Sequence, residues 1–149
     1  MNISTRKRIK TLNEETKVLA KKFLPLADEW LKENGWEDYT FEITEARRDL
    51  ETQAGLFSIG RTYIHWGGWK ITDMKKIVTW TMKSNHITGD AFDGALYKEK
   101  IYHWPDPDIF KNKVMWLALA EISKNIGMYP GGLWENQKPD YPHFSRLPG

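Results

Sequence analysis

The 149-residue chain contains no cysteine, which excludes disulfide bonds and every metal site built from thiolates. A metal ion could therefore be held only by histidine and carboxylate side chains. No apolar run approaches the roughly 20 residues that a membrane-spanning helix needs. The basic N-terminus is not followed by the continuous apolar segment of a secretory signal. We expect a protein made in a cytoplasm, without an export signal of its own and without stable membrane insertion.

Excess charge of one sign is also scarce, because the formal net charge is only +2. The charge is uneven: residues 1–22 carry seven Lys or Arg against two Glu, a net of +5, which leaves −3 for the remainder. These basic residues are spread along a helical pattern with apolar positions between them, so a solvated helix face explains them better than a nucleic-acid site. We therefore expect no nucleic-acid partner.

The spacing of apolar residues predicts a single α+β domain, in which helices pack against a small, mainly antiparallel sheet. Asn13 should cap the first long helix, Pro25 should kink or split it, and Gly127 should close the last one. We expect helices over 13–33, 50–59 and 110–126, strands over 40–44, 77–81 and 91–96, a turn at 98–100 into 101–104, a loop at 66–69, and an irregular tail ending in an extended 142–144. The domain spans 1–149, with a helical region over 1–36 and a core over 37–146.

Two histidines and two aspartates form the most informative pattern in the chain. His86 and Asp93 flank a glycine turn, and Asp140 precedes His143 by three residues. In a straight strand either spacing would send the two side chains to opposite faces, but Gly89 and the neighbouring prolines allow the chain to turn. Two imidazoles and one carboxylate would form a three-ligand zinc set that leaves a fourth position for water, with Asp140 as its candidate base. Each residue alone is more often a surface or turn residue, so the spacing permits a metal site without requiring it.

Three segments resemble a known family. Residues 84–93, Ser-Asn-His-Ile-Thr-Gly-Asp-Ala-Phe-Asp, match the Ser-x-His-x-x-Gly-x-Ala-x-Asp signature of the D-Ala-D-Ala carboxypeptidase and L-alanyl-D-glutamate endopeptidase family of zinc peptidases. Residues 140–144, Asp-Tyr-Pro-His-Phe, match its second motif. Residues 43–61 are similar to its looser Gly-Tyr-Arg-Ser…Gln…Gly-Arg region, although Ala46-Arg47 replace Gly-Tyr and Asp49 replaces Ser. Within the family, the catalytic domains of phage endolysins look most similar.

The resemblance implies a role for each matching residue. It implies that zinc is bound by His86, Asp93 and His143. Asp140 would be the general base, and Arg48, which aligns better than Arg47, would neutralise the oxyanion or bind a substrate carboxylate. Ser84 and Gln53 would support the site as substrate-binding residues. His65 and His103 lie outside the motifs and are interpreted as non-ligands, whereas Trp66, Trp69 and Trp134 could equally line a substrate groove or pack in the core.

The function that this resemblance implies is hydrolysis of the peptidoglycan stem peptide, at the L-alanyl-D-glutamate bond, by a monomeric phage endolysin. Such a lysin would wait in the host cytoplasm until lysis and then act on the cell wall, and this chain would have no separate cell-wall-binding domain. One alternative is a D-Ala-D-Ala carboxypeptidase or dipeptidase, which the sequence separates poorly from the endopeptidase. Another is a non-catalytic zinc-binding module of the same fold, against which the presence of Asp140 and Arg48 argues.

Overall fold

Helices and strands alternate irregularly along the chain, as expected for an α+β fold. The computed structural model describes residues 1–64, 67–79, 82–99, 101–103 and 110–148. Its helices and strands, with two short 3-10 turns, are α1 (Ile3–Ile9), α2 (Glu14–Glu33), β1 (Tyr39–Glu45), α3 (Leu50–Ser58), β2 (Arg61–Ile64), β3 (Gly68–Ile71), η1 (Met74–Lys76), β4 (Ala91–Lys98), β5 (Ile101–His103), α4 (Phe110–Asn125), β6 (Tyr129–Pro130), η2 (Gly131–Leu133) and β7 (His143–Ser145). The predicted fold class is confirmed.

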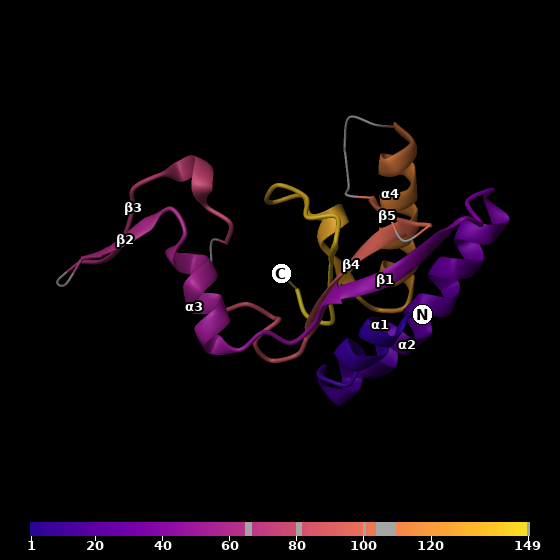
Figure 1. Ribbon diagram of the computed structural model, residues 1–149, viewed down its shortest axis with the longest axis horizontal. Coiled ribbons are helices and arrows are strands. Elements are labelled where there is room, and N and C mark those ends of the chain that lie inside the picture. Colours follow the sequence, from indigo (N-terminus) through magenta and orange to yellow (C-terminus); the bar gives the residue numbers. More distant parts are fainter. Residues whose placement is uncertain (65–66, 80–81, 100, 104–109, 149) are drawn as a thin grey trace.

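The main sheet is antiparallel and is centred on β4 (Figure 1). Its strand order is β1-β4-β7-β6, and β5 also pairs with β4. In register across the sheet, Glu45 of β1 lies opposite Asp93 of β4, which lies opposite His143 of β7. The sheet therefore places three polar residues from distant parts of the chain in one row.

Four phenylalanines form the centre of the core between the helices and the sheet. Phe23 of α2 contacts Phe41 of β1 at 5.1 Å between ring centroids and Phe144 of β7 at 4.9 Å. Phe92 of β4 stacks on Phe144 at 5.6 Å. Gly94 is needed beside them, because a Cβ there would lie 2.1 Å from the ring of Phe41. One aromatic cluster thus joins α2 to all three strands that carry the row of polar residues.

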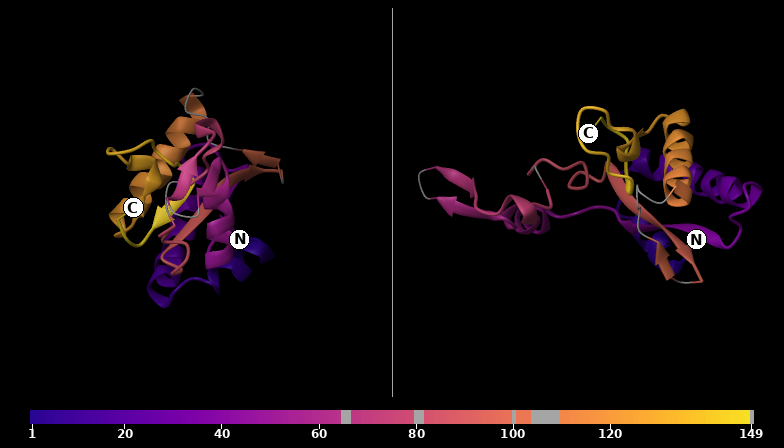
Figure 2. Two further views of the ribbon diagram at one scale, coloured as in Figure 1. Left: turned by 90° about the vertical axis from the view of Figure 1, so that its left-hand side faces the viewer. Right: turned by 90° about the horizontal axis from the view of Figure 1, so that it is seen from above.

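An arm leaves this body after β1 and returns before β4. It consists of α3, the β2–β3 hairpin and η1, and it projects well away from the main sheet (Figures 1 and 2). The hairpin forms a separate two-stranded antiparallel sheet. The arm contributes seven of the twelve exposed large hydrophobic residues of the described chain: Leu50, Ile59, Tyr63, Trp69, Ile71, Met74 and Val78.

Most of the predicted elements are found close to their expected places, but several expectations are wrong. Pro25 lies inside one continuous helix and does not split it, because Phe23, Leu24 and Ala27 are buried and their packing offsets the lost backbone hydrogen bond. Residues 77–79 form no strand, since no partner strand pairs with them within the described chain, and 80–81 lie outside the described residues. The expected loop at 66–69 is wrong for Gly68 and Trp69, which begin β3, while Trp66 lies outside the described residues.

The sequence predicted a helical region over 1–36 but did not resolve the short helix α1 as an element separate from α2. Helix α1 is held against β1 by Glu42, a buried carboxylate that accepts hydrogen bonds from the Asn2 amide and from the Thr5 hydroxyl. Such a contact between residues 37 positions apart leaves no local signal. In the described part of the chain, no helix is both long and apolar enough to cross a bilayer.

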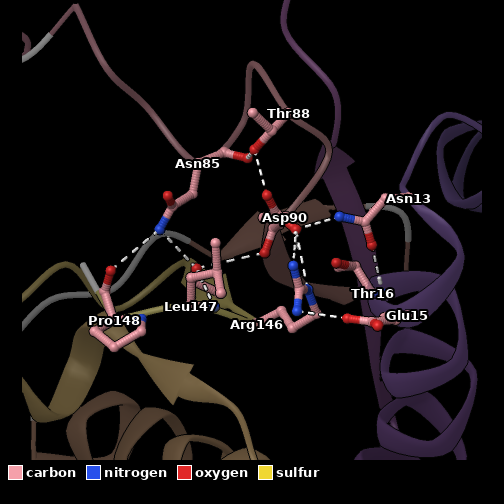
Figure 3. A network of polar contacts seen from close by, with 10 residues as sticks. Asn13, Glu15, Thr16, Asn85, Thr88, Asp90, Arg146, Leu147 and Pro148 are labelled. Carbon is pink, nitrogen blue, oxygen red and sulfur yellow. Dashed lines mark hydrogen bonds and ion pairs between the residues drawn. The ribbon is translucent and has the colours of Figure 1, made fainter.

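Asp90 is the centre of a polar network that ties the signature loop to α2 and to the C-terminal segment (Figure 3). Its carboxylate accepts hydrogen bonds from Thr88, from Asn13 and, at 3.0 and 2.8 Å, from the Arg146 guanidinium. The Asn13 side chain also caps α2 by accepting from the Thr16 amide at 2.8 Å. Burial opposes ionisation, but these donors outweigh it and hold the pKa of Asp90 below its usual range.

Because the pKa of Asp90 is lowered by folding, its ionised form stabilises the native state above the ordinary carboxyl range. That contribution is lost as pH falls through the folded-state pKa. Asp90→Asn should lower the free energy of unfolding by about 1.5–3 kcal/mol at neutral pH, the usual cost of hydrogen bonds to a charged group. Urea titrations should show this difference shrinking in acid. The control Asp38→Asn should change stability little, because the ion pair of Asp38 with Lys98 is exposed. A loss of stability in Asp90→Asn that does not depend on pH would contradict the stabilising role of the ionised Asp90 carboxylate.

Candidate active site

His86 is held in a fixed orientation by the loop that precedes β4. Its ring Nδ1 lies 2.8 Å from the Ala46 carbonyl oxygen, which can only accept, so Nδ1 carries the proton. Its backbone is held too: the His86 amide donates to the Ser84 hydroxyl at 3.2 Å, and its carbonyl accepts from the Arg48 amide at 2.9 Å. Nε2 is therefore left with a lone pair directed away from the loop.

The glycine of the signature is required by the geometry of this loop. Gly89 has a φ of +75°, and a Cβ there would lie 2.8 Å from the Asn13 backbone nitrogen. The Asn13 amide donates to the Gly89 carbonyl at 3.1 Å, so the loop and the start of α2 are in direct backbone contact. This turn brings His86 back over Asp93, as the sequence pattern allowed.

The structure brings the three predicted ligands together. His86 Nε2 and His143 Nδ1 each lie 3.3 Å from the same oxygen, Asp93 Oδ1. One potential ligand atom from each residue lies within 4.8 Å of the others. The two histidines are buried, and Asp93 Oδ1 is buried without a hydrogen-bond donor among the described residues.

This donor set fits a metal ion. Ligands bound tetrahedrally at about 2.0–2.1 Å would lie about 3.3 Å apart, which is the separation of Asp93 Oδ1 from both ring nitrogens. A buried carboxylate oxygen without a donor costs free energy that a bound cation would remove. Imidazole and carboxylate donors suit a divalent transition metal.

The electrostatics of the three side chains favour a positively charged centre. Burial opposes ionisation of Asp93, but His143 and His86 outweigh burial and hold its pKa well below the usual range. Burial also opposes protonation of His86, yet contact with Asp93 raises the pKa of this histidine overall.

Asp140 lies beside the cluster and outside the three-ligand set. Its carbonyl accepts from the His143 amide at 3.1 Å, and its own amide donates to the Gly131 carbonyl at 2.9 Å. A Cβ at Gly131 would lie 2.3 Å from the Asp140 carbonyl oxygen, so this backbone contact needs glycine. Partial desolvation by neighbouring groups, and then the Asp93 charge, raise the pKa of Asp140 despite the opposing histidines, although the residue keeps an exposed surface. A raised pKa suits a carboxylate that accepts and returns a proton.

Arg48 and Gln53 lie together on the arm side of the site. The Arg48 guanidinium donates to Glu45 at 2.7 Å and to the Gln53 side-chain oxygen at 2.7 Å. Burial disfavours its charged form, but contact with Glu45 raises its pKa, so Arg48 stays a cation. Gln53 is fully buried and donates to Thr79 at 3.3 Å. Arg47 is exposed and lies elsewhere, beside Thr11.

One cavity of about 590 Å³ joins these groups. Its lining includes all three candidate ligands, Asp140, Arg48 and Ser84. Trp134 lines the same cavity with its ring centroid 5.3 Å from that of His143, whereas Trp69 lies on the hairpin of the arm. His65 lies outside the described residues. A substrate chain could therefore reach the histidines, the aspartates and the arginine at once.

Two supporting residues were missed from the sequence. Glu45 orients Arg48, and Gly131 supports the backbone of Asp140. Glu45 stands three residues before Arg48 and could have been read as an ion-pair partner. Gly131 left no such signal, because its partner is nine residues away in an irregular segment.

We predict that the protein binds one divalent transition-metal ion per chain and that His86→Ala abolishes stoichiometric binding. The variant removes a buried ring nitrogen that no neighbouring group can replace. Elemental analysis of purified protein measures the metal content. Asp140→Asn is the matched control and should keep its metal, because Asp140 is outside the ligand set; full metal content in His86→Ala would disprove the site.

Comparisons with known proteins identify relatives of this chain. Residues 78–146 match the family described as D-alanyl-D-alanine carboxypeptidase. The chain is 33% identical over 111 residues to the peptidoglycan L-alanyl-D-glutamate endopeptidase CwlK of Bacillus subtilis (strain 168), a match that covers 71% of this chain and 60% of that protein. The crystal structure of the L-Ala D-Glu endopeptidase ChiX of Serratia marcescens has the same fold, with a TM-score of 0.60 and 16% identity over 97% of this chain and 87% of that one. The chain belongs to the D-Ala-D-Ala carboxypeptidase and L-alanyl-D-glutamate endopeptidase family of peptidases.

Proposed function

We propose that this protein is a zinc-dependent peptidase that hydrolyses the stem peptide of peptidoglycan at the L-alanyl-D-glutamate bond. The observation that carries the proposal is the convergence of His86, Asp93 and His143 on one point beside Asp140. Support for the substrate comes from the two similar proteins, both of which are named as endopeptidases for this bond.

Zinc is the metal that we favour for the site. Two imidazole nitrogens and one carboxylate oxygen are typical ligands of catalytic zinc, and such sites leave a further coordination position open. His86 Nε2, Asp93 Oδ1 and His143 Nδ1 would hold the ion, with the Ala46 carbonyl fixing the tautomer of His86 from behind. The chemistry that zinc supplies when bound is activation of water and polarisation of the scissile carbonyl.

The remaining steps fall to residues of the chain itself. Asp140 accepts the proton of the attacking water and returns it to the leaving amine, for which a raised pKa is suited. Arg48 presents a fixed cation to the cavity, where it stabilises the developing oxyanion or binds a carboxylate of the substrate. Glu45 and Gln53 hold that cation in place through their hydrogen bonds, so little reorganisation is needed during the reaction.

A D-Ala-D-Ala carboxypeptidase is the nearest alternative, and the description of the matching family favours it. The two activities would share the same metal ligands and the same base, so the walls of the cavity decide between them. A non-catalytic metal-binding module is less favoured, because Asp140 and Arg48 both line the cavity that contains the ligands.

We further propose that the enzyme is a monomeric phage endolysin. It would be kept in the host cytoplasm until the membrane is opened, and it would then reach the cell wall. The excess positive charge over residues 1–22 would assist binding to the anionic envelope, with an effect that weakens as salt rises.

Asp140→Asn should keep the fold and the metal but lose most turnover. The amide cannot accept the proton, so the rate should fall by about 10²–10⁴-fold, the usual contribution of general acid–base catalysis. Release of soluble peptides from purified cell walls measures this rate. The exposed carboxylate Asp38 provides a matched control, since Asp38→Asn should hydrolyse walls normally; undiminished hydrolysis by Asp140→Asn would assign the base to another residue.

The products of wall digestion should identify the bond. If the L-alanyl-D-glutamate bond is cut, mass spectrometry should find new N-terminal glutamate and a free carboxyl group on the alanine that remains attached to the lactyl group. Released D-alanine without a new glutamate amine would instead establish the carboxypeptidase. Intact walls after prolonged incubation with metal-loaded protein would overturn both activities.

A further inference from the structure

The hairpin of the arm carries an aromatic face. Tyr63 of β2 and Trp69 of β3 lie directly opposite each other in the antiparallel register, with ring centroids 5.4 Å apart. Phe57 of α3 packs edge-on against Trp69 at 5.8 Å. Ile71 shares the face of Trp69, because side chains alternate along a strand. We call Tyr63, Trp69 and Ile71 the hairpin face.

The large side chains of the hairpin face are exposed to solvent. Tyr63 keeps 60% of its surface exposed, Trp69 43% and Ile71 40%. Large apolar side chains gathered on one surface cost free energy in water and commonly mark a place where a ligand or a partner binds. The hairpin projects away from the main sheet, so the face is open to a large ligand (Figure 2).

The hairpin is anchored to the active site by its first residue. The Arg61 guanidinium lies 3.9 Å above the Phe57 ring and donates to the carbonyl oxygens of Phe57 at 2.7 Å and Thr79 at 2.9 Å. Thr79 lines the catalytic cavity and accepts from Gln53, which in turn accepts from Arg48. A continuous set of contacts therefore connects the hairpin face with the wall of the cavity.

The segment that runs from the hairpin back to the cavity is also positively charged. Residues 61–83 contain five Lys or Arg and a single acidic residue, Asp73, a net of +4 in a chain whose total is +2. A ligand that matches this segment should combine apolar surfaces with negative charge. Peptidoglycan has both, because the pyranose rings present C–H faces to aromatic rings and the stem peptides carry free carboxylates.

We propose that the hairpin face binds the glycan strand of peptidoglycan while the stem peptide occupies the catalytic cavity. This inference rests on the proposed function. The L-alanyl-D-glutamate bond lies only one residue from the sugar that carries the stem peptide, so the glycan strand must pass close to the cavity. Leu56, Val78 and Thr79 of the segment between β1 and β4 line the cavity. The arm extends outward from the main sheet (Figure 1), which gives the glycan strand a path along the hairpin face.

The test measures binding to purified cell walls apart from their hydrolysis. All variants carry Asp140→Asn, so that the walls stay intact during the measurement. Combining Tyr63→Ala with Trp69→Ala should raise the wall concentration needed for half-saturation about tenfold or more, because aromatic contacts usually contribute that much to binding. Co-sedimentation with the walls provides the measurement. Thr62→Ala, on the opposite face of β2, and Tyr129→Ala, an exposed tyrosine of β6, should bind like the parent. Unchanged metal content and thermal unfolding would exclude misfolding of the double variant.

Two results would overturn the proposal. One is wall binding by the double variant that equals that of the parent. The other is a parent protein that binds anionic phospholipid vesicles but not cell walls, together with a double variant that no longer binds the vesicles. That result would make the hairpin face a membrane contact. Failure of the proposed function is recognised separately, because wild-type protein would then bind walls through the hairpin face but release no peptide from them.

Discussion

The pairing of β4 with β7 is the constraint on which the rest of the site depends. This register sets Asp93 opposite His143, and the loop before β4 brings His86 over the same carboxylate oxygen. A slip of one residue would turn Asp93 toward the other face of the sheet. Phe92 and Phe144, the neighbours of these ligands, stack in the core and fix the register from the opposite face. The apolar core therefore sets the geometry of the polar site.

Much of this arrangement could be predicted from the sequence, and each success has a physical basis. The helices α2 and α4 and the strand β4 have strong periodic patterns, and Asn13 gives α2 a recognisable start. The ligand set could be proposed because Gly89 allows the loop to turn between His86 and Asp93, and because the resemblance to the zinc peptidases implied these three ligands. Alternation along an extended segment predicted that only one of Arg47 and Arg48 faces the site, and the resemblance to the family selected Arg48.

The parts of the fold that the sequence did not predict depend on contacts between residues that are distant in the chain. Helix α1 is stabilised by a carboxylate on β1, and the strand expected over 77–81 has no partner in the described chain for residues 77–79. The β2–β3 hairpin was missed because each of its strands is only four residues long, so that the sequence predicted nothing more than a loop at 66–69. A sequence does not distinguish an exposed aromatic residue from a buried one. Only the structure therefore decides whether Trp69 packs in the core or lies on a surface.

Asn13 shows how a substitution can be harmless to one element and damaging to another. As a helix cap it could be replaced by aspartate or serine at little cost. Its second contact, however, uses the amide nitrogen as a donor to Asp90, and an aspartate there would set two negative charges against each other at the base of the signature loop. An isolated α2 would tolerate either residue, whereas the folded protein needs a side chain that accepts at one end and donates at the other. The identity of this helix cap is thus decided by the loop that carries His86.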